Sequence, residues 1–231
     1  MLGPDDPQLA SVGAYVAIRT RFFDDFALRA VQTGVRQIAM VAAGMDSRAF
    51  RLSWPEGIAL YEIDRPELLQ LKSEILTREK AQPRCRRIAV GADLEAEWVA
   101  PLIDAGFAPG EPSLWLAEGV FFYLEENSVH SILAGLSGVA AAGSWLGCDF
   151  VSASFLTSPW MSDALSSMAA RGMPWRSGTD APEALLAVHG WEAEVRQPGE
   201  PGISPERWPY PVLQRVFQRV PRSFLASARR R

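Results

Sequence analysis

The chain has 231 residues, of which 48% are hydrophobic, with a formal net charge of −4 and an isoelectric point near 5.3. This length and apolar content are enough to bury the core of one domain. A mildly acidic chain lacks the basic surface that binds nucleic acid, and the basic tail Arg229 to Arg231 is most simply a solvated end. We therefore expect a single domain over residues 1–231 and no nucleic-acid partner.

Cysteine usage and the N-terminus indicate the cytoplasm. Cys85 and Cys148 are too few for a disulfide framework, and they form no metal-ligand cluster with the two histidines. The first residues carry acids where a signal peptide carries positive charge, and no apolar run reaches the roughly eighteen residues of a membrane span. We expect a cytoplasmic protein with no metal and no membrane partner.

Strands alternate with helices along the chain. An amphipathic helix over residues 11–33 comes first and stops at Gly34. The predicted strands are 37–41, 58–63, 86–90, 113–117, 145–150, 191–196 and 222–228, and the helices between them are 67–80, 98–105, 125–142 and 182–188. Residues 155–179 predict a lid or an insertion. This alternation is typical of an α/β fold whose mostly parallel sheet has helices on both faces.

The most informative segment runs from the first of these strands to the end of the second. The first strand ends at Ala42, Ala43 and Gly44, whose small side chains let the backbone approach a ligand closely. The second strand ends at Asp64, about twenty residues later, where an acid can accept two hydrogen bonds from a ribose diol. The segment therefore predicts a site for an adenosine-containing cofactor.

Five motifs occur in order along the chain. They are RTRFFDD from Arg19, AAGMDSRAFRL from Ala42, YEID from Tyr61, Asp93-Leu94, and AEG from Ala117 followed by Tyr123-Leu124. Together they resemble the leucine carboxyl methyltransferase family, and most closely its bacterial S-adenosylmethionine-dependent O-methyltransferases, many of which act in secondary metabolism. The resemblance covers about residues 12–230. It implies a Rossmann-like class I methyltransferase fold, with a seven-stranded, mostly parallel sheet and an antiparallel last strand.

The resemblance also implies S-adenosylmethionine as the cofactor and gives each of its groups a partner. An arginine of the leading helix would pair with the carboxylate, with Arg19 the first choice and Arg21 the second. Asp64 would accept from the ribose, and Glu118 would face the ammonium and sulfonium. The other implied contacts are the turn Ala42, Ala43 and Gly44 against the methionine part, and Asp93 and Leu94 around the adenine.

Several of these residues have a structural interpretation too. Arg19 and Arg21 could pair with the acids that follow them on a solvated helix. Asp64 could cap the next helix, a role that is compatible with ribose binding. An ion pair between Asp46 and Arg48 that braces the turn is as consistent with the sequence as direct ligand contact is.

The acceptor stays open, and so does the proton chemistry. The resemblance implies O-methylation of a carboxylate or a hydroxyl of a small molecule, with a secondary metabolite as the expected class. A carboxylate is ionised at neutral pH and needs no base, whereas a hydroxyl needs one within hydrogen-bond reach. His130, His189 and Tyr123 are the candidates, but contact with a helix dipole or core packing explains each of them as well. We therefore assign no catalytic residue.

Two alternatives come from other classes. The family has a longer helical region ahead of the arginine helix, so the few residues before Ser11 fit a naturally short form, a mis-called start, or an open pocket. The last of these favours a protein that binds the cofactor without turnover. A nicotinamide dehydrogenase would need three glycines in the first turn, where this chain has Gly44 alone. An antiparallel last strand would distinguish the methyltransferase from the dehydrogenase.

Overall fold

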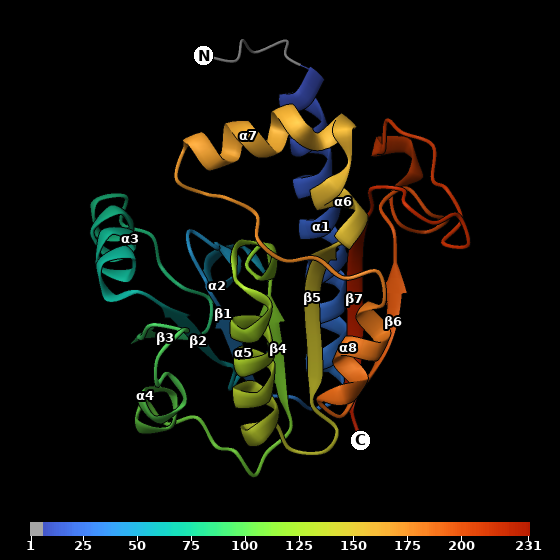
Figure 1. Cartoon of the computed structure of the whole chain (residues 1–231). Coiled ribbons are helices and arrows are strands. Elements are labelled where there is room, and N and C mark those ends of the chain that lie inside the picture. Colours follow the sequence, from blue (N-terminus) through green and yellow to red (C-terminus); the bar gives the residue numbers. More distant parts are fainter. Residues whose placement is uncertain (1–6) are drawn as a thin grey trace.

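A seven-stranded sheet forms the centre of the molecule (Figure 1). The computed structural model describes residues 7–231. The strands lie in the order β3-β2-β1-β4-β5-β7-β6. Their bounds are β1 Gln37–Val41, β2 Ala59–Asp64, β3 Arg86–Gly91, β4 Ser113–Ala117, β5 Trp145–Val151, β6 Trp191–Arg196 and β7 Ser223–Arg230.

The sheet is parallel except for its last strand in sequence. Every pairing from β3 across to β5 is parallel, whereas β7 lies antiparallel between β5 and β6. The predicted antiparallel last strand is therefore confirmed, and with it the distinction from the dehydrogenase sheet. The chain moves outward from β1 to β3 and then returns to β4 on the other side of β1. The order thus reverses between β1 and β4, where open α/β sheets bind their ligands.

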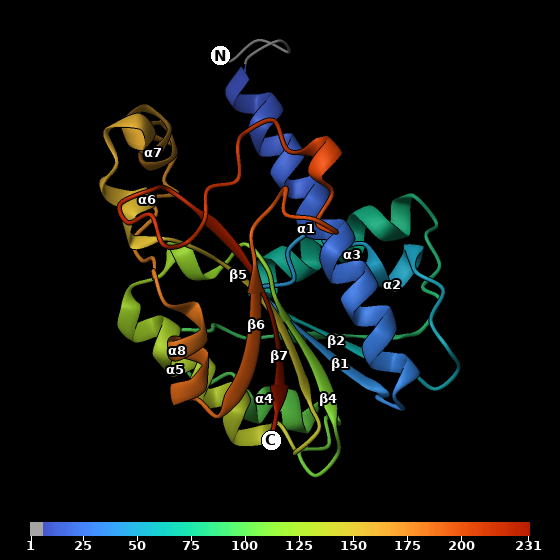
Figure 2. The ribbon, with the colours of Figure 1, turned by 90° about the vertical axis from the view of Figure 1, so that its right-hand side faces the viewer.

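Helices cover both faces of the sheet (Figure 2). The α-helices are α1 Pro7–Gln32, α2 Arg48–Arg51, α3 Pro66–Arg78, α4 Val99–Asp104, α5 Glu126–Val139, α6 Ala153–Thr157, α7 Ser162–Ala170 and α8 Pro182–Val188. Short 3-10 helices are η1 Phe121–Tyr123, η2 Pro159–Met161 and η3 Pro205–Arg207. None of the helices within residues 7–231 is long and apolar enough to cross a membrane.

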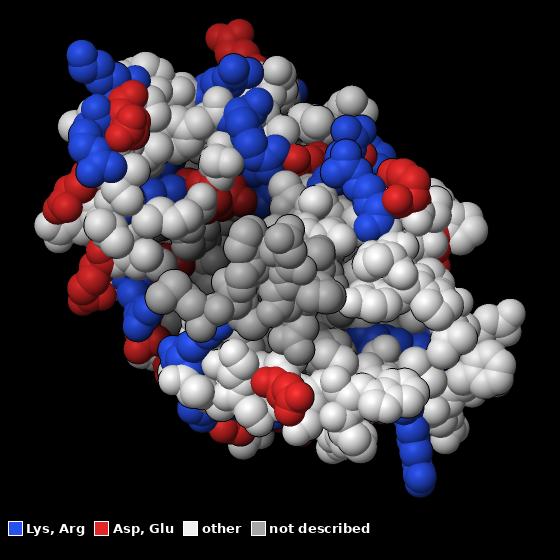
Figure 3. Space-filling view, turned by 90° about the horizontal axis from the view of Figure 1, so that it is seen from above, with Lys and Arg blue, Asp and Glu red and all other residues white. Residues whose placement is uncertain are grey.

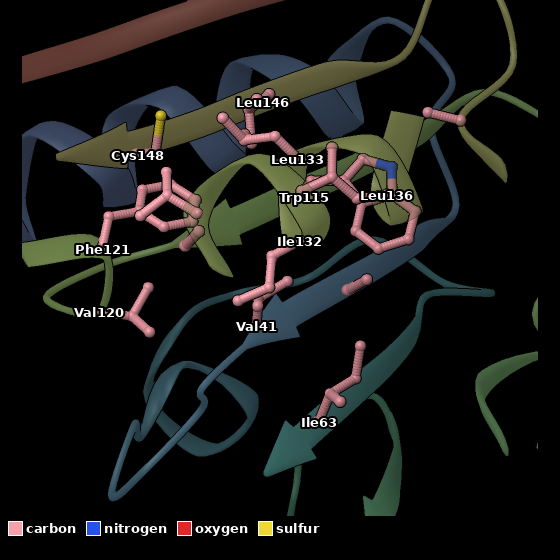
Figure 4. Close-up of a cluster of buried hydrophobic side chains, with 14 of the residues drawn as sticks. Val41, Ile63, Trp115, Val120, Phe121, Ile132, Leu133, Leu136, Leu146 and Cys148 are labelled. Carbon is pink, nitrogen blue, oxygen red and sulfur yellow. The ribbon is translucent and has the colours of Figure 1, made fainter. Parts of the chain in front are cut away.

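One apolar layer lies between the sheet and the helices α4, α5 and α8. Ile132, Leu133 and Leu136 of α5 are fully buried against the strands, and Trp115 of β4 packs among them (Figure 4). Cys148 of β5 belongs to the same layer and has no exposed surface. Packing in this layer holds β4 and β5 in place, and with them the residues at their carboxyl ends.

The long helix α1 packs on the opposite face. Phe23 and Phe26 are buried there, and the Phe26 ring meets Trp145 of β5 edge-on, with 5.4 Å between ring centroids. A Cβ added to Gly147 of β5 would lie 2.8 Å from the Phe23 ring, so a glycine is what allows this close contact. The helix thus lies along β5, and Tyr15 and Arg19 of α1 reach Asp149 near the carboxyl end of that strand.

The predicted boundaries differ from the observed ones by a few residues. The first helix begins at Pro7 rather than at residue 11, and proline suits a first helical position because its φ is already helical. The strand predicted over 58–63 extends to Asp64. Residues 155–179 contain η2, α7 and part of α6, beyond the carboxyl end of the sheet (Figures 1 and 2). A lid function for this segment stays a prediction, as does the single domain over residues 1–231.

Candidate functional site

A cavity of about 250 Å³ opens at the carboxyl ends of β1 and β4, beside α1. Figure 3 looks down on this end of the molecule, where acidic and basic side chains lie close together. The cavity lies at the reversal of strand order. Its lining comes from α1, the end of β1 and the turn after it, α2, and β4 with the residue that follows it. The polar side chains among these are Arg19, Thr20, Asp46, Arg48 and Glu118.

The turn after β1 has an unusual backbone. Ala42 has φ +54° and Gly44 has φ +49°. A positive φ is uncommon for alanine and is found where surrounding structure holds the backbone in place. Here the Ala43 amide donates to the Ile63 carbonyl at 3.1 Å, and the Gly44 amide donates to Asp64 Oδ2 at 2.7 Å. The turn that the sequence singles out is therefore tied to the end of β2 and faces the cavity.

Asp64 braces this turn and does not cap α3. Its Oδ1 accepts from the Arg65 amide at 2.8 Å, while the N-cap of α3 is Arg65, which makes no side-chain cap bond. The helix-cap interpretation is therefore wrong. Each carboxylate oxygen of Asp64 accepts one backbone amide, and a carboxylate has lone pairs for about four acceptor sites. The side chain keeps capacity for a ribose diol.

Asp93 and Leu94 follow β3 at the same edge of the sheet. Gly91 pairs with Asp64 in the β2–β3 register, so Asp93 lies two residues beyond that pair along the chain. Its side chain is exposed and accepts a local hydrogen bond from the Glu95 amide, at 3.0 Å. Leu94 is half-buried against the core. Neither residue lines the 250 Å³ cavity, and Asp64 does not line it either.

Arg48 is the charged centre of the cavity floor. Its Nη1 lies 2.5 Å from Asp46 Oδ2, and its backbone amide donates to Asp46 Oδ1 at 2.6 Å. The ion pair that braces the turn is thus confirmed. Arg48 is only 2% exposed, and its Nε donates to Asp24 Oδ1 at 2.7 Å. The same side chain lines the cavity, so bracing and ligand contact are compatible.

The two arginines of α1 lie in different environments. Arg21 is 73% exposed and pairs with Asp25 at 2.7 Å, as the solvated-helix interpretation expects. Arg19 lines the cavity, and its Nη1 donates to Asp149 Oδ2 at 3.0 Å. The buried Nε of Arg19 has no hydrogen-bond partner within the described part of the chain. Of the two, only Arg19 presents an unused donor at the cavity.

Glu118 lies between two arginines. Its Oε1 is 2.5 Å from Arg48 Nη1, and its Oε2 is 3.6 Å from Arg19 Nε. Burial raises the pKa of the Glu118 carboxyl to about 7, even though both arginines act to lower it. A carboxyl that closes an apolar strand thus has charged partners, and it changes its charge near neutral pH.

Asp149 is a site residue that we did not predict. It has no exposed surface on β5, and its oxygens accept from Arg19 Nη1, from the Tyr15 hydroxyl at 2.6 Å and from the Gly119 amide at 2.6 Å. The signal for it is the same as for Glu118, a lone acid within an apolar strand.

The three candidates for a base lie outside the cavity lining. His130 Nδ1 is 3.0 Å from His189 Nε2, so the two imidazoles bond to each other between α5 and the end of α8. Tyr123 lines a second cavity of about 290 Å³, which Arg176 and Met173 also line. Among residues 7–231, no group of three or more potential ligands is arranged to hold a metal ion.

Solved structures with a similar backbone define the class of fold. A DUF574 family protein from Streptomyces avermitilis superposes with a TM-score of 0.68 at 19% identity, over 94% of this chain and 83% of that one. Magnesium protoporphyrin IX methyltransferase from Synechocystis PCC 6803, solved with bound S-adenosylhomocysteine, superposes with a TM-score of 0.57 at 11% identity, over 93% and 84%. The chain has the class I S-adenosylmethionine-dependent methyltransferase fold.

Sequence comparison is more specific than the fold. The model of the leucine carboxyl methyltransferase family matches residues 4–137. A relative from Parafrankia is 42% identical over 78% of this chain and 58% of its own length, and one from Streptomyces avermitilis is 41% identical over 83% and 68%. Both are named S-adenosyl-L-methionine-dependent methyltransferases. The chain belongs to the leucine carboxyl methyltransferase family, and it spans 58% to 68% of the length of these relatives.

Proposed function

We propose that the chain binds S-adenosylmethionine in the Arg19–Glu118 cavity and transfers its methyl group to an oxygen of a small molecule. The observation that carries this proposal is the pairing of opposite charges in one cavity beside the positive-φ turn. The amino-acid part of the cofactor is a zwitterion, with a carboxylate and an ammonium on one carbon. An arginine and a carboxylate 3.6 Å apart match these two charges.

The residues in and around the cavity match the chemical groups of S-adenosylmethionine. The unpartnered Nε of Arg19 is a donor for the carboxylate, and Glu118 is an acceptor for the ammonium. The turn Ala42 to Gly44 brings backbone without bulky side chains against the methionine part. Asp64 would hold the ribose diol, and Asp93 and Leu94 would hold the adenine. The bound cofactor supplies an electrophilic methyl group on its sulfonium.

The acceptor is an oxygen nucleophile, a carboxylate or a hydroxyl, in a small molecule of the secondary-metabolite class. With a carboxylate acceptor the protein has only to hold two reactants in line, which is worth about 7–11 kcal/mol in well-oriented reactions. A hydroxyl acceptor needs a base, and Tyr123 and His130 lie outside the cavity lining. The carboxylate therefore requires the least from the residues that line the site.

The first experiment measures cofactor binding by calorimetric titration with S-adenosylhomocysteine. Asp64→Ala removes charged hydrogen bonds to the ribose and is expected to weaken binding by about 1.5–3 kcal/mol while the sheet stays folded. Asp104→Ala, which removes an exposed acid at the end of α4, is the matched control and should leave the affinity unchanged. Equal affinity for wild type and Asp64→Ala would remove Asp64 from the site.

A second experiment follows methyl transfer from labelled S-adenosylmethionine in a single turnover with a panel of small-molecule acids and phenols. For a carboxylate acceptor, the rate of the chemical step is expected to stay flat from about pH 6 to 9, because an ordinary carboxyl is ionised throughout. A rate that rises steeply with pH, together with a methylated product that is stable to alkali, would show that the acceptor is a hydroxyl and not a carboxylate. Tight cofactor binding with no transfer to any acceptor would favour a binding protein without turnover.

A further inference from the structure

Asp149 lies behind the cavity and does not line it. It is a buried carboxylate at the centre of three hydrogen bonds from three separate segments of the chain. Tyr15 donates from α1 at 2.6 Å, the Gly119 amide donates from the loop after β4 at 2.6 Å, and Arg19 Nη1 donates at 3.0 Å. Among these donors only Arg19 carries a charge, so it is the counter-ion of Asp149.

The contact with Asp149 involves one nitrogen of the Arg19 guanidinium and leaves the Nε side of the group unpaired in the described chain. Asp149 engages Nη1, while Nε is buried without a hydrogen-bond partner in the described chain. A guanidinium can bind a second carboxylate through its Nε–Nη2 edge. Burial alone would lower the pKa of Arg19, but Asp149, Tyr15 and Glu118 more than offset this effect and raise it, so the group stays charged.

Gly119 lies beside the Arg19 guanidinium. It has φ +66°, and a Cβ placed there would lie 2.8 Å from Arg19 Nη1 and 3.2 Å from Nη2. A side chain at this position would therefore clash with the guanidinium, and glycine lets the loop after β4 run beside it. Glu118 already lies 3.6 Å from the Arg19 Nε, on the cavity wall, and without Asp149 it would be the carboxylate left to pair with Arg19. We expect that Arg19 would then turn toward Glu118, so that the Nε–Nη2 edge of its guanidinium would be occupied.

We propose that Asp149 is a positioning residue that holds Arg19 with its Nε edge free for the carboxylate of the cofactor's amino-acid part. This inference rests on the proposed function. Asp149 acts through Arg19 and does not touch the ligand. The competing interpretation is that Asp149 only anchors α1 through the Tyr15 hydroxyl. The two interpretations differ in which ligands, and which variants, should be affected.

The test compares two ligands by calorimetric titration. S-adenosylhomocysteine carries the amino-acid carboxylate, and 5′-methylthioadenosine lacks the whole amino-acid part. Asp149→Asn keeps the shape of the side chain and removes its charge. We expect the dissociation constant of S-adenosylhomocysteine to rise about tenfold or more, and that of methylthioadenosine to change less than about twofold. Equal losses for both ligands would overturn the positioning role.

Two further variants separate positioning from anchoring. Tyr15→Phe removes the hydroxyl that anchors α1 but leaves the Arg19–Asp149 pair, so S-adenosylhomocysteine affinity should change little. Gly119→Ala pushes on the guanidinium while Asp149 keeps its charge, and we expect the same selective loss as in Asp149→Asn. If Asp149→Asn does not fold, Asp149→Glu keeps the charge but displaces the oxygen that accepts from Arg19 Nη1, and the same selective loss is expected. A Tyr15→Phe variant as impaired as Asp149→Asn would show that anchoring is the role.

A double-mutant cycle tests whether Asp149 acts through Arg19. Once Arg19→Ala has removed the clamp, adding Asp149→Asn should change S-adenosylhomocysteine affinity by less than about twofold. Losses that multiply would mean that Asp149 acts by another route, and would overturn this inference while leaving the proposed function intact. A wild-type chain that binds neither ligand would overturn the proposed function, and this inference with it.

Discussion

Three carboxylates converge on Arg48, and this arrangement sets the electrostatics of the site. Asp24, Asp46 and Glu118 all lie within 2.7 Å of its guanidinium nitrogens. A second arginine, Arg19, faces Glu118 from α1. Burial of this cluster favours the neutral form of the Glu118 carboxyl, and its pKa is raised even with the two arginines beside it. Changing a single charge in this cluster should therefore alter both the affinity for the ligand and the pH dependence of that affinity.

The choice between the two arginines of α1 gives a sharp prediction. Arg19→Lys should weaken S-adenosylhomocysteine binding about tenfold although the charge is kept, because lysine cannot form the planar bidentate pair. Arg21→Lys is the matched control: Arg21 is 73% exposed and pairs only with Asp25, so affinity should not change. Calorimetric titration of both variants measures the effect. The reverse order would move the carboxylate contact to Arg21.

The raised pKa of Glu118 predicts a pH-dependent affinity. Its pKa is about 7 in the free protein, where burial favours the neutral form against Arg48 and Arg19, and Asp149 and Asp46 add to the rise. A cofactor ammonium favours the ionised form, so binding releases a proton and the affinity should increase from about pH 5.5 to about pH 7. Titration in buffers of different ionisation enthalpy would detect the proton. Glu118→Gln should bind more weakly with a flat profile, and a flat wild-type profile would contradict the assignment.

The helix α1 depends on a close approach to β5, at the scale of whole elements. Phe23 and Leu116 would lie 2.8 and 3.0 Å from a Cβ at Gly147, so the helix and the strand meet with no room for a methyl group. This contact matters to the site because α1 carries Arg19. The packing of one helix thus positions the main cationic group of the cavity.

Gly147→Ala should therefore destabilise the protein by about 1–3 kcal/mol, the usual cost of overpacking a core. Gly138→Ala is the matched control. Gly138 lies in α5 with no atom within 4 Å of an added Cβ, and alanine in a helix interior is favoured over glycine by about 0.5–1 kcal/mol. Urea unfolding measures both variants. Opposite signs are expected, and a neutral Gly147→Ala would show that α1 can move away from β5.

For the whole molecule, the two apolar layers share one sheet. Strands β1, β2, β4 and β5 contribute side chains to the layer under α5 and to the layer under α1. Since neither layer can be removed without exposing the other face of the same strands, the described chain should unfold as one cooperative unit.

Thermal unfolding followed by near- and far-ultraviolet circular dichroism should give coincident transitions. S-adenosylhomocysteine at about 100 times its dissociation constant should add about 2.7 kcal/mol to the free energy of unfolding, because it binds only the folded state. Two separate transitions would divide the chain, contrary to the single domain that we expect. A ligand that shifts only one of two transitions would show which part holds the site.

Sequence alone determined what local patterns control. Apolar runs of five or six residues and the helical periodicity between them predict the seven strands within a few residues, because these signals depend on neighbours in the chain. The turn at Ala42 to Gly44 and the acid at Asp64 were found for the same reason, since the turn directly follows one strand and the acid ends the next. The resemblance to the family adds the mostly parallel sheet with its antiparallel last strand, and the order of the strands comes from the structure.

Tertiary structure decided which side chains meet. Arg19 and Arg21 are two residues apart, which places them roughly 200° apart around a helix of 3.6 residues per turn, and only the packing of α1 on β5 turns Arg19 to the cavity. Asp149 meets Tyr15 across 134 residues of sequence. No local pattern encodes such a contact, because the distance between two distant residues depends on how every element between them packs.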